Sequence, residues 1–183
     1  MQKQVNIDLK LLYNWLLANK ISLNCAKTEF IIFEKTNKRP IINFEYKIKM
    51  NGHKLRPSGY IKYLGVYLDT HLTGKFHCNV ILKKLKRANG MLSKARHYVS
   101  TDEIKSIYHA IFSSHMVYGC QVWGQQSNIH TIKISKSQNK AMRIISFSDF
   151  HAHSNPIYNR EEIIKLYDFV SLHCKIVYLS MIT

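Results

Sequence analysis

The last strand-like segment of the chain reads Tyr60-Ile61-Lys62-Tyr63-Leu64-Gly65-Val66-Tyr67-Leu68-Asp69. We predict one strand from Tyr60 to Leu68. Its interior Gly65 indicates a bulge or a close approach of backbone, because glycine otherwise weakens a strand. After Asp69 the strand signals end, and apolar residues recur at helical spacing. The sequence therefore predicts an α+β fold, in which a small unit of helix, strand, hairpin and strand precedes an all-helical region.

The segment before this strand carries signals for the helix, the first strand and the hairpin. A helix is expected from residue 6 to residue 19, and a strand from Thr28 to Phe33. Residues 42–50 alternate in part between apolar and polar, and Asn51-Gly52 is a strong signal for a two-residue turn, in which both residues need positive φ. We therefore expect a hairpin there. The apolar stripe of the helix consists of Ile7, Leu11, Leu12, Trp15 and Leu16.

The helical region should contain four helices, because its apolar residues follow the helical period. The second begins with a capping box, Ser100-Thr101-Asp102-Glu103, in which the serine oxygen and the glutamate carboxylate satisfy each other's backbone amides. The fourth should open at Asn159, after a loop from His151 to Pro156, since acidic residues favour a first helical turn. The expected helices are residues 76–99, 100–118, 127–145 and the segment from 159 onward.

The chain is strongly basic. It has 27 lysines and arginines against 11 aspartates and glutamates among 183 residues, a net charge of +16. Such an imbalance favours a polyanionic partner, and nucleic acid is the first choice. The alternative is a basic protein of an A/T-rich genome, in which lysine and asparagine codons accumulate on solvated surfaces.

Cysteine spacing and hydropathy argue against a zinc-binding protein and a membrane protein. Cys25, Cys78, Cys120 and Cys174 are far apart, so no Cys-x-x-Cys half-site for zinc is present. No apolar run approaches the roughly 20 residues that span a bilayer. We expect reduced thiols, no membrane partner, and a nuclear or cytoplasmic location.

Two segments, in this order, resemble the last palm motifs of reverse transcriptases from non-LTR (LINE-type) retrotransposons. They are Leu23-Asn24-Cys25-Ala26-Lys27-Thr28-Glu29-Phe30 and Lys62-Tyr63-Leu64-Gly65-Val66-Tyr67-Leu68-Asp69. Further matches follow in the family's order, namely Gly90, Ile107-Tyr108, Tyr118-Gly119, Trp123-Gly124, Gln138-Asn139-Lys140-Ala141 and Arg143-Ile144-Ile145. The resemblance implies a palm remnant with a primer-grip hairpin at 1–70, thumb helices at 71–124 and a post-thumb helical region at 125–183.

The resemblance assigns roles to residues of the first part. Tyr63, Leu64 and Gly65 match the primer grip, where a glycine would let backbone approach the sugar-phosphate chain of the primer. Lys27 matches a lysine on the triphosphate side, whose ammonium would neutralise charge or protonate the pyrophosphate leaving group in an intact enzyme. The alternative for Lys27 is a solvated turn lysine.

The long helix expected from Phe76 would be a thumb helix that lies along the template-primer duplex. Lys83, Arg87 and Lys94 would contact phosphates, with Gly90 on the same side permitting a closer approach. Lys84 and Lys86 would flank them. Such contacts position nucleic acid without reading its sequence. The alternative is a solvated lysine face, whose neutralisation would change only solubility.

No two aspartates are adjacent in the chain, although two-metal nucleotidyl transfer needs carboxylates that share the divalent cations. We therefore predict a truncated RNA-directed DNA polymerase that keeps template-primer-binding elements but lacks the catalytic pair and any metal site. Mg²⁺ would be required only by an intact enzyme. Two alternatives are a domesticated helical protein-interaction module at residues 76–182 with an incidental basic face, and an enzyme completed by a separately encoded upstream half. The aspartates are Asp8, Asp69, Asp102, Asp149 and Asp168.

Overall fold

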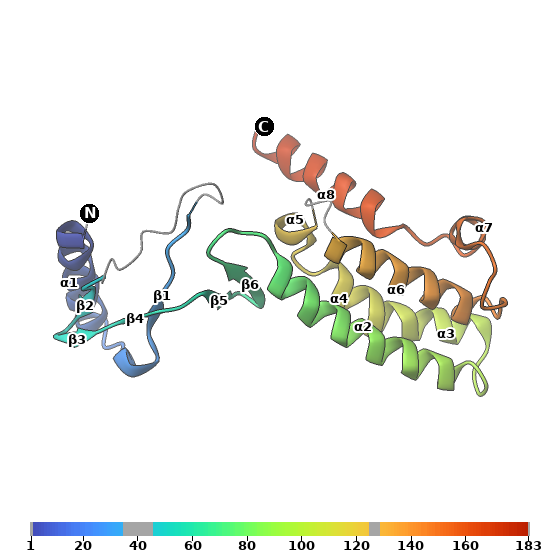
Figure 1. Ribbon diagram of the computed structural model, residues 1–183, viewed down its shortest axis with the longest axis horizontal. Helices are drawn as coiled ribbons and strands as arrows, with labels where there is room; N and C mark the ends of the chain where they lie inside the picture. The colour runs from blue at the N-terminus through green and yellow to red at the C-terminus, as the bar shows by residue number, and fades with distance from the viewer. Residues whose placement is uncertain (1, 35–45, 125–128, 183) are drawn as a thin grey trace. The chain divides into compact units, whose positions relative to one another are not determined.

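The computed structural model describes residues 2–34, 46–124 and 129–182 (Figure 1). The chain divides into two compact units, residues 1–72 and 73–183. The first unit combines one helix with short strands, and the second is helical. This confirms the predicted α+β class. A division of the helical part near residue 124 stays a prediction.

The strands of the first unit are short, and within the described ranges they form three two-stranded sheets. The strands β1 and β4 are parallel, whereas β2 with β3 and β5 with β6 are antiparallel. The predicted strand from Thr28 to Phe33 is reduced to β1. The elements are α1 (Gln2–Ala18), β1 (Glu29–Phe30), β2 (Lys49–Met50), β3 (His53–Lys54), β4 (Arg56–Pro57), β5 (Tyr60–Tyr63) and β6 (Val66–Asp69).

The predicted hairpin at Asn51-Gly52 is confirmed. Met50 pairs with His53 across the turn, and the two turn residues have φ of 47° and 76°. Positive φ at both central positions is the requirement that made this dipeptide a strong turn signal. Of the segment expected to form its first strand, residues 42–45 lie outside the described residues, and Lys49–Met50 form β2.

The prediction of one strand from Tyr60 to Leu68 was wrong. The segment is itself a hairpin, in which Tyr63 pairs with Val66 and the chain turns at Leu64-Gly65. These two residues have φ of 44° and 82°. Gly65 therefore marks a turn and not a strand interior. The Leu-Gly pair gave no clear signal because a non-glycine residue such as leucine rarely adopts positive φ.

Helix α1 covers the first hairpin with a different face from the one predicted. Val5, Leu9, Tyr13 and Leu16 pack against the buried core of this unit, which consists of Ile48, Met50 and Leu55. Of the predicted apolar stripe, only Leu16 belongs to this packed face, and the other four residues are exposed. The helix has apolar residues on more than one side, so periodicity alone could not identify the buried one.

The second unit contains the remaining helices, and α3 continues into α4 through a π-helical segment, His109–Ser113. The predicted capping box is present, with the Ser100 amide donating to Glu103 Oε2 at 2.8 Å. The expected helix start at Asn159 was wrong, because α7 begins within the predicted loop and ends at Arg160. The helices are α2 (Lys75–Ala95), α3 (Thr101–Tyr108), α4 (Ser114–Val117), α5 (Cys120–Trp123), α6 (Ile129–Ile145), α7 (Ser154–Arg160) and α8 (Leu166–Ser180).

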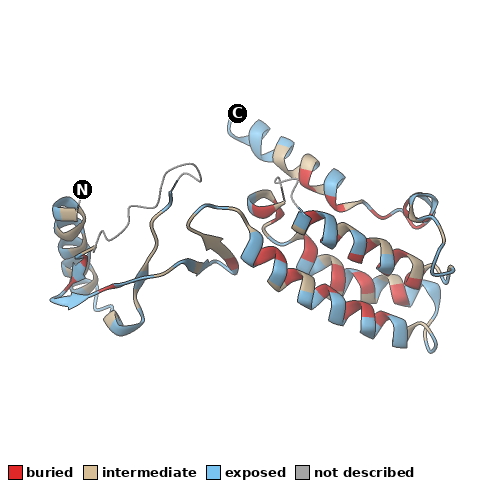
Figure 2. Ribbon diagram, viewed as in Figure 1, coloured by how far each residue is buried: buried red, intermediate tan, exposed pale blue. Residues whose placement is uncertain are grey.

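Buried residues concentrate in this helical unit (Figure 2). Helices α2 and α6 pack against each other, and α3, α4 and α8 add further contacts around them. The largest side chain in the core is Trp123, and Tyr108 stacks on Phe112 at a centroid distance of 5.2 Å. The helical unit therefore has a closed apolar core of its own.

A buried glutamine connects three parts of this core. Gln138 of α6 is 1% exposed. Its Nε2 donates to Tyr108 Oη at 3.3 Å and to the Ile164 carbonyl at 3.0 Å. Its Oε1 accepts from the Leu166 amide at 3.0 Å, the first amide of α8. The side chain thus joins α6 to α3 and to the segment that leads into α8.

Replacing Gln138 with leucine should lower the free energy of unfolding by about 2 to 4 kcal/mol, because the Leu166 amide, the Ile164 carbonyl and the Tyr108 hydroxyl lose their partner inside the core. Urea denaturation followed by circular dichroism measures this. Ser135→Ala is the control, because the hydrogen bond that this hydroxyl donates to the Thr131 carbonyl stays within its own helix. Equal midpoints for the two variants would contradict the assigned role.

Replacing Gly124 or Gly90 with alanine should change the stability of the protein in opposite directions. A Cβ on Gly124 would lie 2.6 Å from the Cys120 carbonyl oxygen and 2.6 Å from Val170 Cγ2, whereas a Cβ on Gly90 would meet nothing within 4 Å. We expect Gly124→Ala to lower stability by about 1 to 3 kcal/mol through overpacking. Gly90→Ala should raise it by about 1 kcal/mol, because alanine favours a helix. Thermal denaturation of both variants tests this, and shifts of the same sign would be the contrary result.

Candidate nucleic-acid interface

Helix α2 presents the predicted nucleic-acid-binding cations on its solvent side. Its opposite side is buried in the core through residues such as Ile81, Leu85 and Leu92. The helix contains no acidic residue, so nothing on α2 itself offsets the positive charge. The predicted cations Lys83, Lys84, Lys86, Arg87 and Lys94 are all exposed.

These five cations do not point in one direction. At 100° per residue, Lys83, Arg87 and Lys94 lie opposite the buried stripe and form an outer ridge. Lys86 is turned to one flank, where it lines a groove together with residues of α6. Lys84 is turned to the other flank, close enough to His77 and His115 to affect both imidazoles. The structure therefore separates the predicted set into a ridge and two flanks.

The histidines beside Lys84 stay neutral near pH 7. Burial, together with the smaller effect of the Lys84 charge, lowers the pKa of His77 to about 4. The same two causes lower the pKa of His115. A lowered pKa favours the neutral folded form, so this contribution to stability is present above the ordinary pKa of 6.5 and is lost as the pH falls toward 4. The charge of this face at neutral pH comes from its lysines and Arg87.

Helix α6 contributes three lysines that the sequence analysis missed. Lys133, Lys136 and Lys140 follow one another at i, i+3 and i+7, which places them on one side of the helix. Like α2, α6 contains no acidic residue. That spacing without an intervening acid is a signal visible in the sequence, although only the packing of α6 against α2 shows that both sets share a surface.

Lys27 lies at the end of a short 3₁₀ turn, Cys25–Lys27, whose geometry is fixed by Asn24. The Lys27 amide donates to Asn24 Oδ1 at 3.2 Å. The Lys27 side chain is exposed and lines a polar pocket of about 510 Å³ together with Tyr60, Lys62 and Tyr67 of the second hairpin. The structure thus brings Lys27 beside the strands β5 and β6.

The predicted primer-grip residues form the tip of that hairpin. Tyr63 is 61% exposed and Leu64 is 73% exposed, and Gly65 completes the turn. None of these three residues lines the pocket that contains Lys27. The structure therefore places Lys27 near the hairpin but not at its tip.

The acidic residues of the described ranges do not form a metal site. Asp69 accepts a hydrogen bond from the His71 amide at 3.2 Å, which is a turn contact. No group of three or more histidine, cysteine, aspartate or glutamate side chains is placed to hold a metal ion in the ranges that the structure describes. No described helix is both long and apolar enough to cross a bilayer.

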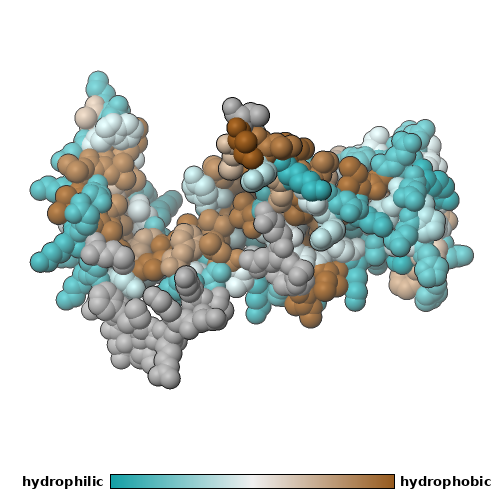
Figure 3. Space-filling model, turned by 90° about the horizontal axis from the view of Figure 1, so that it is seen from above, coloured by the Kyte–Doolittle hydropathy of each residue, from teal (hydrophilic) through white to brown (hydrophobic). Residues whose placement is uncertain are grey.

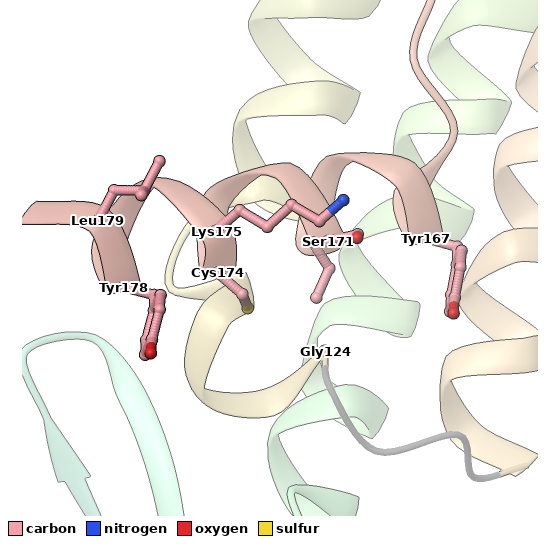
Figure 4. Close-up of a pocket in the computed structure, with 8 residues that line it drawn as sticks. Gly124, Tyr167, Ser171, Cys174, Lys175, Tyr178 and Leu179 are labelled. Atoms are coloured by element: carbon pink, nitrogen blue, oxygen red, sulfur yellow. The ribbon is translucent and has the colours of Figure 1, made fainter.

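A second surface of the helical unit is apolar. A groove of about 610 Å³ runs along α8, lined by residues such as Tyr167, Cys174 and Tyr178, with Gly124 at its floor (Figure 4). Hydrophobic side chains gather over the end of α8, where Tyr178 and Met181 are 66% and 79% exposed (Figure 3). This surface offers packing area without the charge of α2 and α6.

Comparison with known proteins gives three related polymerases. The chain is 25% identical over 162 residues to the "Probable RNA-directed DNA polymerase from transposon X-element" of Drosophila melanogaster, which covers 87% of this chain and 17% of that protein. It is 28% identical over 147 residues to the "RNA-directed DNA polymerase from mobile element jockey" of Drosophila funebris. That alignment covers 78% of this chain and 15% of the jockey protein. It is 30% identical over 125 residues to the "RNA-directed DNA polymerase from mobile element jockey" of Drosophila melanogaster. That alignment covers 66% of this chain and 14% of the jockey protein.

The chain therefore spans about one sixth of the length of the curated relatives that it matches. No family model matches it. No solved structure matches it either. The alignments extend over most of the chain, in agreement with the resemblance that its motifs indicated. The chain is homologous to part of the RNA-directed DNA polymerases of non-LTR retrotransposons.

Proposed function

We propose that this chain holds the template-primer duplex of a retrotransposon reverse transcriptase and does not itself catalyse polymerisation. The single observation that carries the proposal is the outer ridge of α2, where Lys83, Arg87 and Lys94 face solvent on a helix without acidic residues. Ammonium and guanidinium groups in this arrangement contact phosphates and position a duplex without reading its sequence. The homologous polymerases support nucleic acid as the partner.

The first unit would serve the primer end. Polymerisation depends on alignment of the primer 3′ hydroxyl, which can supply about 7 to 11 kcal/mol of barrier lowering. The exposed hairpin turn at Leu64-Gly65 suits a contact with the primer backbone, and Lys27 in the adjacent pocket suits the triphosphate side. Both roles belong to an intact enzyme, where other carboxylates would hold Mg²⁺. We place this activity in the nucleus or the cytoplasm.

A second candidate function is a helical protein-interaction module. The apolar groove along α8 favours it, because Tyr167, Tyr178 and Met181 expose area that a protein partner would cover. The basic face would then be incidental. A third possibility is an enzyme completed by a separately encoded upstream half, which an in-frame Asp-Asp segment upstream of Met1 in the genome would support.

Replacing Lys83, Arg87 and Lys94 together with glutamate should weaken duplex binding by at least about tenfold at low salt. It should also make the salt dependence shallower, since each lost phosphate contact removes roughly 0.9 from the slope of log K against log salt for duplex DNA. Fluorescence anisotropy with a labelled duplex across a salt series measures both quantities. The wild-type chain should show steep salt dependence.

The control for this variant reverses the same amount of charge on the first unit, at the exposed residues Lys3, Lys10 and Lys47. Circular dichroism should show both variants folded. A ridge variant that binds as tightly as wild type, or a wild-type affinity indifferent to salt, would instead favour the protein-interaction module.

A further inference from the structure

Helices α2 and α6 together form a groove that is bordered by lysines and differs from the outer ridge. It has a volume of about 690 Å³. Lys86 stands on the α2 side, and Lys133, Lys136 and Lys140 stand on the α6 side. Asn89 and Ser137 provide the polar lining between the two helices. None of the outer-ridge residues Lys83, Arg87 and Lys94 lines this groove.

The charge in the groove calls for an anion with more than one phosphate. Neither helix supplies a carboxylate, and the described ion pairs of this unit, Lys105 and Arg160 with Glu161, lie elsewhere. Lys133 and Lys140 are seven residues apart, which is about 10 Å along a helix. A row of ammonium groups of this length matches successive phosphates of a strand better than one isolated phosphate.

Asn89 adds an acceptor to this basic groove. Asn89 is buried, with 4% of its surface exposed. Its Nδ2 donates to the Ser137 carbonyl at 3.0 Å and to Ser137 Oγ at 3.0 Å. Because a carbonyl oxygen can only accept, this contact fixes the orientation of the amide. Asn89 Oδ1 is then buried and has no hydrogen-bond partner among the described residues.

A buried acceptor among lysines selects a ligand that combines phosphates with a donor. A buried acceptor without a partner is costly, so a ligand donor that reaches it gains free energy. The sugar-phosphate backbone of DNA has no hydroxyl beside its phosphates, whereas each internal nucleotide of RNA carries a 2′-hydroxyl that can donate. The row of lysines and the buried acceptor Asn89 Oδ1 therefore both favour RNA as the ligand.

We propose that the groove between α2 and α6 binds the backbone of an RNA strand, with the four lysines on its phosphates and Asn89 Oδ1 accepting from a 2′-hydroxyl. The inference deepens the proposed nucleic-acid binding and rests on it. It assigns recognition of RNA over DNA to Asn89 and separates this site from the duplex contacts of the outer ridge.

The test measures affinities of the full chain for single strands of one sequence, made as RNA, DNA and 2′-O-methyl RNA. The wild-type chain should bind RNA several-fold more tightly than the other two, because a 2′-O-methyl group keeps the oxygen but cannot donate. Equal affinity of the wild-type chain for the three strands would overturn the proposal without any variant being needed.

Two variants locate the effect. Asn89→Ala should reduce the affinity for RNA to the level of DNA, whereas Ser135→Ala, at a hydroxyl that does not line the groove, should keep the preference. If Asn89→Ala alone does not fold, Asn89→Ala with Ser137→Ala removes both side-chain partners and takes its place. An RNA preference that survives the loss of Asn89 in a folded protein would overturn the assignment.

The lysines are tested with Lys133→Gln, Lys136→Gln and Lys140→Gln in one protein. Binding of both RNA and DNA should weaken, and the salt slope for single strands should fall by roughly 0.7 for each lost contact. Unchanged binding would overturn the groove. Wild-type protein that binds no nucleic acid refutes the proposed function itself, whereas duplex binding that depends on Lys83 but not on the groove refutes only this inference.

Discussion

The structure of the candidate interface depends on the packing of α2 against α6. Each helix buries an apolar side in the shared core, and each exposes lysines without an acidic residue to balance them. Burial of the apolar sides therefore brings like charges onto one surface, at a cost in repulsion that a polyanionic ligand would relieve. The hydrogen bonds of Asn89 to Ser137 join the two helices at the floor of this surface.

The part of α6 that resembles the polymerase family, Gln138 to Ile145, has a structural role in addition to the proposed binding role of Lys140. Gln138 bonds to the start of α8, Asn139 Oδ1 accepts from Tyr158 Oη at 2.9 Å, and Arg143 Nε donates to the Ala152 carbonyl at 2.7 Å. Three residues on two successive turns of α6 thus hold the chain that follows it. The resemblance in this segment is explained by folding, whereas the exposed Lys140 beside it faces the groove.

The sequence predicted those features whose signals are local. The capping box at Ser100 and the turn at Asn51-Gly52 are properties of a few adjacent residues, and both are present. The turn at Leu64-Gly65 was missed because leucine carries no turn signal. The start of α8 was missed because Glu162 adopts a φ of 57° and separates α7 from α8. The groove could not be predicted, because it requires knowing that Lys86 and Lys136 come from packed neighbours.

The most direct test of this account is the reactivity of individual lysines toward an acylating reagent, measured by mass spectrometry with and without an RNA–DNA hybrid. Lys83 on the ridge and Lys136 in the groove should be protected by the hybrid, while Lys3 on α1 and Lys175 beside the α8 groove keep their reactivity. Equal reactivity of Lys83 and Lys136 with and without the hybrid, or protection confined to Lys175, would contradict the account.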